Sequence, residues 1–155
     1  MISFTLNGKT VSSGQPPLAR LIDVLRGELG ETSVKEGCGE GECGACSVLL
    51  DGKLVNTCII PLARAEGANI VTMTGFAETA RGKALIAAFE SEGGVQCGFC
   101  IPGMVLASEA LLDDNPHPTE PEIREALSGN LCRCTGYDLI IQAVIAASER
   151  GSGLW

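Results

Sequence analysis

Eight cysteines are the residues of this sequence whose type and spacing could do chemistry, and they fall into two sets. In the first set, Cys38, Cys43 and Cys46 stand with four and two residues between them, and Cys58 follows after eleven more. Three sulfurs in one glycine-rich stretch, with a fourth further along the chain, is the spacing that holds a plant-type 2Fe-2S cluster. The first set therefore predicts a 2Fe-2S site.

A chain that wraps three sulfurs around a flat cluster needs residues that can take positive φ angles, and glycine takes them most readily. The stretch 37–46 contains four glycines for this purpose: Gly37, Gly39, Gly41 and Gly44. Such a loop can also direct backbone N–H groups at the sulfurs, which raises the reduction potential of a cluster. Cys58 is expected at the end of a hairpin strand, where a rigid scaffold fixes the fourth ligand.

The second set consists of two close pairs, Cys97 with Cys100 and Cys132 with Cys134. Each pair lies just ahead of an expected helix, so helix N-termini can direct partial positive charge towards a net-negative cluster. Two cysteines from each of two helix starts close a four-thiolate site. Beside the first set, a second 2Fe-2S cluster is the most economical interpretation.

Zinc sites, disulfides and a redox-active cysteine pair are the alternatives. Zinc knuckles usually combine two short CxxC-type corners, which disfavours zinc at the first set but leaves it open for the second set taken alone. Disulfides are disfavoured because no export signal is recognisable, and a reducing compartment keeps thiols reduced. A thioredoxin-like pair is disfavoured because the CxxC does not follow a strand of a βαβ unit.

The first half of the sequence predicts a small mixed α/β unit that positions the first set. Two hairpins are expected, one over residues 2–11 around Asn7-Gly8, the other from 47–50 and 53–59 around Asp51-Gly52. A last strand is expected over 70–74. An amphipathic helix ending at Gly30 is predicted between the hairpins from apolar residues at helical spacing. These residues are Leu18, Leu21, Ile22, Leu25 and Leu29.

The second half predicts four short helices, which together make a bundle. The first contains Ala84, Leu85, Ala88 and Phe89 and ends at Gly93-Gly94. The second opens at Pro102, buries Met104, Val105, Leu111 and Leu112, and stops at Asn115-Pro116. The third begins with a capping box of Thr119 and Glu122, and the fourth carries Ile140, Ala143, Val144 and Ala147 on one face.

Three segments carry a resemblance to a known family. They are Gly37-Cys38-Gly39-Glu40-Gly41-Glu42-Cys43-Gly44-Ala45-Cys46, Gln96-Cys97-Gly98-Phe99-Cys100 with Pro102-Gly103, and Asn130-Leu131-Cys132-Arg133-Cys134-Thr135-Gly136-Tyr137. Together they resemble the iron–sulfur subunit of the molybdenum hydroxylases. This is the family of xanthine oxidase and aldehyde oxidoreductase, and it includes the small subunits of carbon monoxide dehydrogenase and nicotinate dehydrogenase. The resemblance runs from about residue 2 to about 148 and matches all eight cysteines.

The resemblance implies an α+β chain with two domains, a β-grasp plant-type ferredoxin domain over 1–76 and an all-α four-helix bundle over 77–155. It implies an electron-transfer subunit that takes electrons from the molybdopterin cofactor of a large subunit. They pass through two 2Fe-2S clusters to another acceptor, usually an FAD-binding medium subunit. It places the second cluster nearest the molybdopterin, with Gln96 and Cys134 at the junction. A free-standing soluble ferredoxin is the alternative.

The charge and hydropathy of the chain limit the classes of partner and the cellular location that can be expected. The formal net charge of −8 argues against nucleic acid and anionic membrane surfaces, since both favour basic proteins. No segment has the length and apolar character of a membrane span, so a cytoplasmic chain without membrane insertion is expected. No nucleophile–base set, phosphate-binding glycine loop or carboxylate pair is recognisable, so substrate chemistry is expected in another chain of the oxidoreductase.

Four further residues are singled out with weaker expectations. Arg133, between two cysteines, either pairs with an interface carboxylate or offsets cluster charge. His117, between two prolines, is expected to be a loop residue and not a ligand, because eight cysteines already fill two clusters. Ile101 stands where many members of the family have threonine. Trp155 is expected to lie in a frayed tail.

Overall fold

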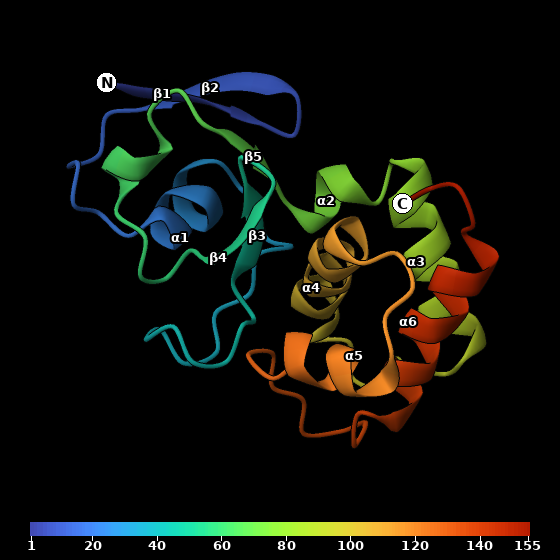
Figure 1. Cartoon of the computed structure of the whole chain (residues 1–155). Helices are drawn as coiled ribbons and strands as arrows, with labels where there is room; N and C mark the ends of the chain where they lie inside the picture. The colour runs from blue at the N-terminus through green and yellow to red at the C-terminus, as the bar shows by residue number, and fades with distance from the viewer.

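The computed structural model describes residues 1–155 and contains one five-stranded mixed sheet. Its strands are β1 (Ile2–Leu6), β2 (Lys9–Ser13), β3 (Ser47–Leu50), β4 (Lys53–Asn56) and β5 (Asn69–Val71). They lie in the order β2-β1-β5-β3-β4, and only the β1–β5 pair is parallel. The sheet lies in the first half of the chain with one short helix beside it, and the second half is helical, which is the expected α+β class (Figure 1).

Both predicted hairpin turns are confirmed. Asn7 and Gly8 have φ angles of 49° and 80°, and Asp51 and Gly52 have 50° and 79°. Positive φ at both central residues matches the right-handed twist of the flanking strands.

Two strands are shorter than predicted. The chain turns after Asn56, where the Ile59 N–H bonds the Asn56 carbonyl, so Cys58 lies beyond β4 and not at its end. β5 stops at Val71 because the N–H of Thr72 bonds the side chain of Asn7. Thr72 then leads into α2 (Met73–Phe76) in place of the expected strand.

The predicted first helix begins later than expected. α1 (Leu21–Asp23) continues as a π-helical turn over Val24–Glu28. Leu18 lies outside it, in a turn closed by the Ala19 N–H and the Pro16 carbonyl, and is 84% exposed, because bonds from the segment after Pro61 hold this turn in place. The other apolar residues of the stripe are buried against the sheet or lie next to it, and Gly30 ends the segment with a φ of 68°.

The four helices predicted in the second half are confirmed, and α2 precedes them. They are α3 (Ala80–Ser91), α4 (Ile101–Asp114), α5 (Glu120–Ala126) and α6 (Asp138–Arg150). Thr119 and Glu122 form the expected capping box at the start of α5. No helix has the combination of length and apolar composition that a membrane crossing requires.

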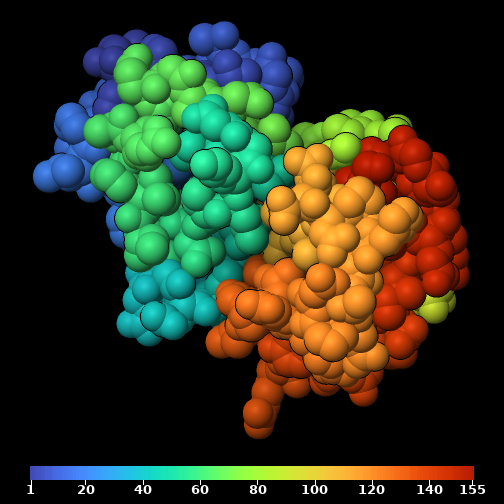
Figure 2. Space-filling view, viewed as in Figure 1, coloured from blue at the N-terminus to red at the C-terminus, as the bar shows by residue number.

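The two halves share a packed boundary and are not joined by a loose linker. Leu49 of β3 belongs to the apolar core of the helical half, and Leu54 and Val71 pack against the same core. Figure 2 shows the sheet half and the helical half in direct contact. The relative position of the loops that carry the cysteines is therefore set by side-chain packing.

The expectation of a frayed tail is wrong for Trp155. Its indole N–H donates to the carboxylate of Glu109 at 2.6 Å, and the guanidinium of Arg81 lies 5.9 Å from the ring centroid. Arg81 also bonds the carbonyl of Leu154 and the carboxylates of Glu109 and Asp113. Glu109 is only 6% exposed, and a buried carboxylate requires such partners.

Candidate functional site

The loop of the first set directs backbone N–H groups at cysteine sulfurs. The Sγ of Cys38 accepts from the N–H groups of Glu40, Glu42 and Cys43 at 3.3–3.4 Å. The Gly41 N–H donates to Cys58 Sγ at 3.2 Å. These donors stabilise negative charge on sulfur, and the three at Cys38 lower its pKa to about 6.

The glycines of this loop serve two purposes. Gly39, Gly41 and Gly44 have φ angles of 70°, 81° and 72°, as predicted. Gly37 does not take a positive φ, which corrects the prediction. It is needed for space instead, because a Cβ there would lie 2.8 Å from the Sγ of Cys43.

The other side of the first set is buried. Cys46 and Cys58 are 2% and 3% exposed, whereas Cys38 is exposed. Burial, together with the neighbouring Cys46, raises the pKa of Cys58 to about 11. The first set thus has one edge open to solvent and one edge packed against the sheet.

The four cysteines of the second set line one cavity of about 250 Å³, together with Phe99, Leu131 and Arg133. Cys100 stands at the N-cap position of α4 and is 9% exposed. Burial, followed by the neighbouring Cys132, raises the pKa of Cys100 to about 12. Cys97 and Cys134 are exposed, with their sulfurs 3.5 Å apart. Proximity to Cys97 raises the pKa of Cys134.

Two residues that follow the second set, neither of them predicted to have a role, contact Cys132. Thr135 Oγ1 lies 3.1 Å from Cys132 Sγ, and the Cys132 N–H donates to the hydroxyl of Tyr137 at 2.8 Å. Burial acts to raise the pKa of Cys132, but the Thr135 hydroxyl and nearby backbone N–H groups outweigh it and lower the pKa. The sequence did contain a signal for both residues, because they belong to the third segment that resembles the family, residues 130–137.

The sulfurs are arranged in four close pairs. The pairs are Cys38 with Cys43, Cys46 with Cys58, Cys97 with Cys134, and Cys100 with Cys132. None of the eight cysteines is in a disulfide. A 2Fe-2S cluster places two protein ligands on each of two irons, whereas structural zinc needs four around one ion. The donor set therefore fits two 2Fe-2S clusters.

The loops of the two sets touch each other. The Leu131 N–H donates to the Cys43 carbonyl at 2.9 Å, and the Asn130 side-chain amide donates to the Gly44 carbonyl at 3.1 Å. Gly103 of α4 packs so closely that a Cβ there would lie 2.4 Å from the Gly44 carbonyl oxygen. In Figure 1 both loops lie at the same end of the molecule.

The remaining candidates lie at different distances from the sulfurs. Gln96 is exposed beside Cys97, and Arg133 is exposed on the rim of the cavity of the second set. His117 lies elsewhere, with its Nδ1 3.5 Å from the hydroxyl of Ser148 in the last turns of α6. Ile101 is partly buried against the helical core.

Two family models match the chain in succession. A "2Fe-2S iron-sulfur cluster binding domain" matches residues 4–69, and a "[2Fe-2S] binding domain" matches residues 72–145. Each match contains one complete cysteine set, in agreement with the prediction of one cluster for each half.

The chain is also similar to whole subunits of known enzymes. It is 51% identical over 149 residues to the nicotinate dehydrogenase small FeS subunit of Eubacterium barkeri, covering 96% of this chain and 95% of that one. Its structure matches a chain of quinoline 2-oxidoreductase from Pseudomonas putida 86 with a TM-score of 0.90 and 41% identity, covering 96% and 93%. It matches the aldehyde oxidoreductase of Desulfovibrio desulfuricans ATCC 27774 with a TM-score of 0.88 and 42% identity, over 97% of this chain but 17% of that longer one. Because these likenesses run through both cysteine-bearing halves, the chain belongs to the iron–sulfur subunits of the molybdenum hydroxylases, and it carries electrons through two 2Fe-2S clusters within such an oxidoreductase.

Proposed function

We propose that the first set holds one 2Fe-2S cluster and the second set holds the other. The observation that carries this assignment is the arrangement of the sulfurs in four pairs, two pairs in each set. Backbone N–H groups at the first set and the helix start at Cys100 supply the partial positive charge that a net-negative cluster needs. The bound clusters supply one-electron redox chemistry, and the chain positions and insulates them.

The second cluster is proposed to face the molybdopterin of a large subunit, with Gln96 and Cys134 at the junction. An apolar surface around the second set supports this direction. Seven large apolar side chains of the chain are exposed, and four of them belong to segments that flank the second set. They are Val95, Phe99, Leu131 and Leu139. Exposed apolar side chains gathered at one site are typical of a surface that a partner covers.

Electrons are proposed to leave by the first cluster, towards an FAD-binding medium subunit. Cys38 is exposed at the outer edge of the first set, and Ile59, next to Cys58, is 59% exposed. These two features give a partner access to the first cluster.

We propose a β-grasp ferredoxin domain over 1–76 and a helical cluster domain over 77–155, built around a four-helix bundle. The sheet order and the position of α1 support the first assignment, and the core that α3, α4, α5 and α6 share supports the second. The two family matches end and begin at residues 69 and 72, a few residues before this boundary. A cytoplasmic location is proposed because none of the eight cysteines is in a disulfide, and a reducing compartment keeps cysteines available as ligands.

Purification of the chain from its own cells tests the proposed partners. We expect it to copurify with a large molybdenum-containing chain and a flavin-containing chain. Elution as a lone iron–sulfur protein would favour the free ferredoxin instead.

Replacement of Gln96 tests the proposed junction. In Gln96→Ala both clusters should remain loaded, since glutamine is not a ligand, and their reduction by dithionite should be unchanged. Their reduction by the substrate of the complex should be slower, because the loss of one hydrogen bond to a buried cofactor costs about 1–3 kcal/mol. Rapid mixing of the complex with its substrate measures this rate. Gln142→Ala, on the exposed side of α6, is the matched control.

A further inference from the structure

Thr135 donates a side-chain hydrogen bond to a cysteine sulfur. Its Oγ1 lies 3.1 Å from Cys132 Sγ and accepts the Tyr137 N–H at 3.3 Å. A hydroxyl has one proton to donate. One of its two lone pairs accepts the Tyr137 N–H, and its single proton is donated to the Cys132 sulfur.

The chain that follows Thr135 has an unusual backbone conformation. Gly136 and Tyr137 have φ angles of 69° and 73°, and a bulky non-glycine residue rarely adopts that left-handed region. Such strain persists only where surrounding contacts hold it, and it is concentrated at functional sites. Tyr137 also stands at the N-cap of α6, so its conformation fixes where this helix begins.

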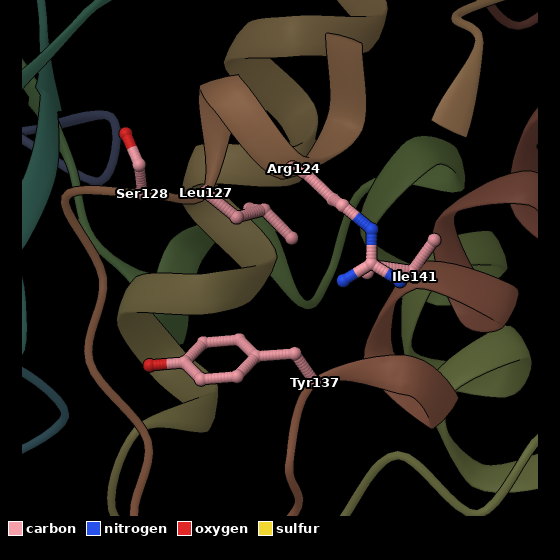
Figure 3. A pocket seen from close by; sticks show the side chains of 5 residues that line it. All are labelled: Arg124, Leu127, Ser128, Tyr137 and Ile141. Carbon is pink, nitrogen blue, oxygen red and sulfur yellow. The ribbon is translucent and has the colours of Figure 1, made fainter. Parts of the chain in front are cut away.

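The side chain of Tyr137 supplies the contacts that hold this conformation. Its hydroxyl accepts the Cys132 N–H at 2.8 Å, and its ring packs against the helical core. Figure 3 shows the ring lining a pocket with Leu127 and Ile141, with the hydroxyl at the end remote from Ile141. Tyr137 therefore ties the backbone of Cys132 to α5 and α6.

We propose that Thr135 and Tyr137 are positioning residues that set the reduction potential of the second cluster through Cys132. Tyr137 holds the Cys132 backbone in place, and Thr135 donates a hydrogen bond to its sulfur. One-electron reduction adds one negative charge to a cluster, and a donor at a ligand sulfur stabilises that charge. The hydrogen bond thus raises the potential of the second cluster and makes it a better acceptor of electrons. This inference rests on the proposed assignment of Cys132 as a ligand.

The test is a redox titration of the purified complex, followed by electron paramagnetic resonance, which resolves the two clusters. Thr135→Val removes the donor and keeps the shape. At a fixed potential it should lower the ratio of reduced to oxidised second cluster about tenfold, which is about 59 mV for a one-electron couple. The first cluster should keep its potential. Thr135→Ser keeps the hydroxyl and should restore the wild-type value.

Thr57→Val is the matched control. Thr57 is a buried threonine next to Cys58, but its hydroxyl donates to the Cys46 carbonyl at 2.9 Å and not to a sulfur. This variant should leave the potential of the second cluster unchanged. If Thr135→Val loses iron, Thr135→Ala is used in its place with the same expected shift.

Tyr137→Phe tests the positioning role separately. It should speed the loss of iron from the second cluster to a chelator several-fold and leave the first cluster unaffected. The proposal is overturned if Thr135→Val, or Thr135→Ala where it is used instead, leaves the potential of the second cluster at the wild-type value. It is overturned likewise if Thr135→Ser lowers that potential as far as Thr135→Val does. It is also overturned if Tyr137→Phe retains iron like the wild type. Full iron content in a Cys132→Ser variant would instead overturn the assignment of Cys132 as a ligand. That outcome is distinct from a failure of the roles proposed for Thr135 and Tyr137.

Discussion

At the residue scale, the protein gives its cysteine sulfurs opposite electrostatic environments. Backbone N–H groups lower the pKa of Cys38 to about 6, whereas burial raises that of Cys100 to about 12. Because only the thiolate binds metal, the exposed loop of the first set is charged and ready for iron at neutral pH. Cys100 loses its proton only when a metal replaces it.

This difference predicts the order of alkylation in protein freed of iron. At pH 7 Cys38 should react first, since it is mostly thiolate, and Cys100 should stay protected until the chain unfolds. A pH series with iodoacetamide, read by mass spectrometry, should give half-maximal labelling of Cys38 near pH 6. Labelling that rises only above pH 8 would contradict the expected environment. By linkage, the lowered pKa stabilises the metal-free fold fully above the unfolded value of 9.0, and this contribution is lost as the pH falls through about 6.

Replacement of single ligands tests the assignment of each set. Cys43→Ser and Cys100→Ser should each lose half of the iron and one of two paramagnetic signals, the first-cluster signal in the former and the second-cluster signal in the latter. Cys100→Ser should also lower the melting temperature more, because its cluster joins two loops of a small helical half. Iron analysis and thermal unfolding measure both effects. Ser108→Ala, a buried change within α4, is the control that should keep all the iron.

At the element scale, the first turn of α4 contributes to both cysteine sets. It carries Cys100 at its N-cap, and through Gly103 it lies against the Gly44 carbonyl in the loop of the first set. Helix α4 can approach that loop only because Gly103 has no side chain. One helix start therefore places a ligand of one cluster and fixes the distance to the other.

Gly103→Ala should therefore force the two halves apart. The added Cβ meets backbone at 2.4 Å, so we expect the variant to be less stable by about 1–3 kcal/mol. Gly129→Ala is a sharp control, because Gly129 lies in the same boundary region, has no positive φ and has open space around its Cβ position. Urea unfolding of both variants measures the difference. Equal stability of Gly103→Ala and the wild type would show that the close packing is not required.

At the scale of the whole molecule, the boundary between the halves sets the distance between the two clusters. Asn130 is 4% exposed, and its side-chain amide donates to the Gly44 carbonyl and the Ser47 hydroxyl. The next residue, Leu131, bonds the Cys43 carbonyl. One short segment thus ties the backbone before Cys132 to the loop of the first set.

Asn130→Ala should weaken this boundary without removing a ligand. We expect full iron content, a loss of about 1–3 kcal/mol in stability, and a change in the magnetic interaction between the two reduced clusters. Low-temperature electron paramagnetic resonance of fully reduced protein reports that interaction. Ser108→Ala also removes a buried hydrogen bond, but within one helix, and should leave the interaction unaltered. An identical change in both variants would mean that Asn130 contributes only to general stability.

The sequence by itself determined the features that depend on neighbours along the chain. Cysteine spacing predicted two cluster sites, Asn7-Gly8 and Asp51-Gly52 predicted their turns, and apolar periodicity predicted the helices of the second half. These features follow from local stereochemistry and side-chain spacing, which a sequence records directly. The family resemblance then supplied the role in electron transfer.

Only the tertiary structure decided how distant residues meet. The contact of Asn130 with Gly44 joins residues 86 positions apart. Leu18 lies outside its predicted helix because bonds from the segment after Pro61 hold it in a turn. Trp155 was expected in a frayed tail, but its indole donates a hydrogen bond to the buried Glu109, 46 positions away. Gly37 is small because a sulfur occupies the space beside it, and not because its φ is positive. Each outcome depends on packing and on hydrogen bonds between distant segments, which override local preference and leave no periodic signal in the sequence.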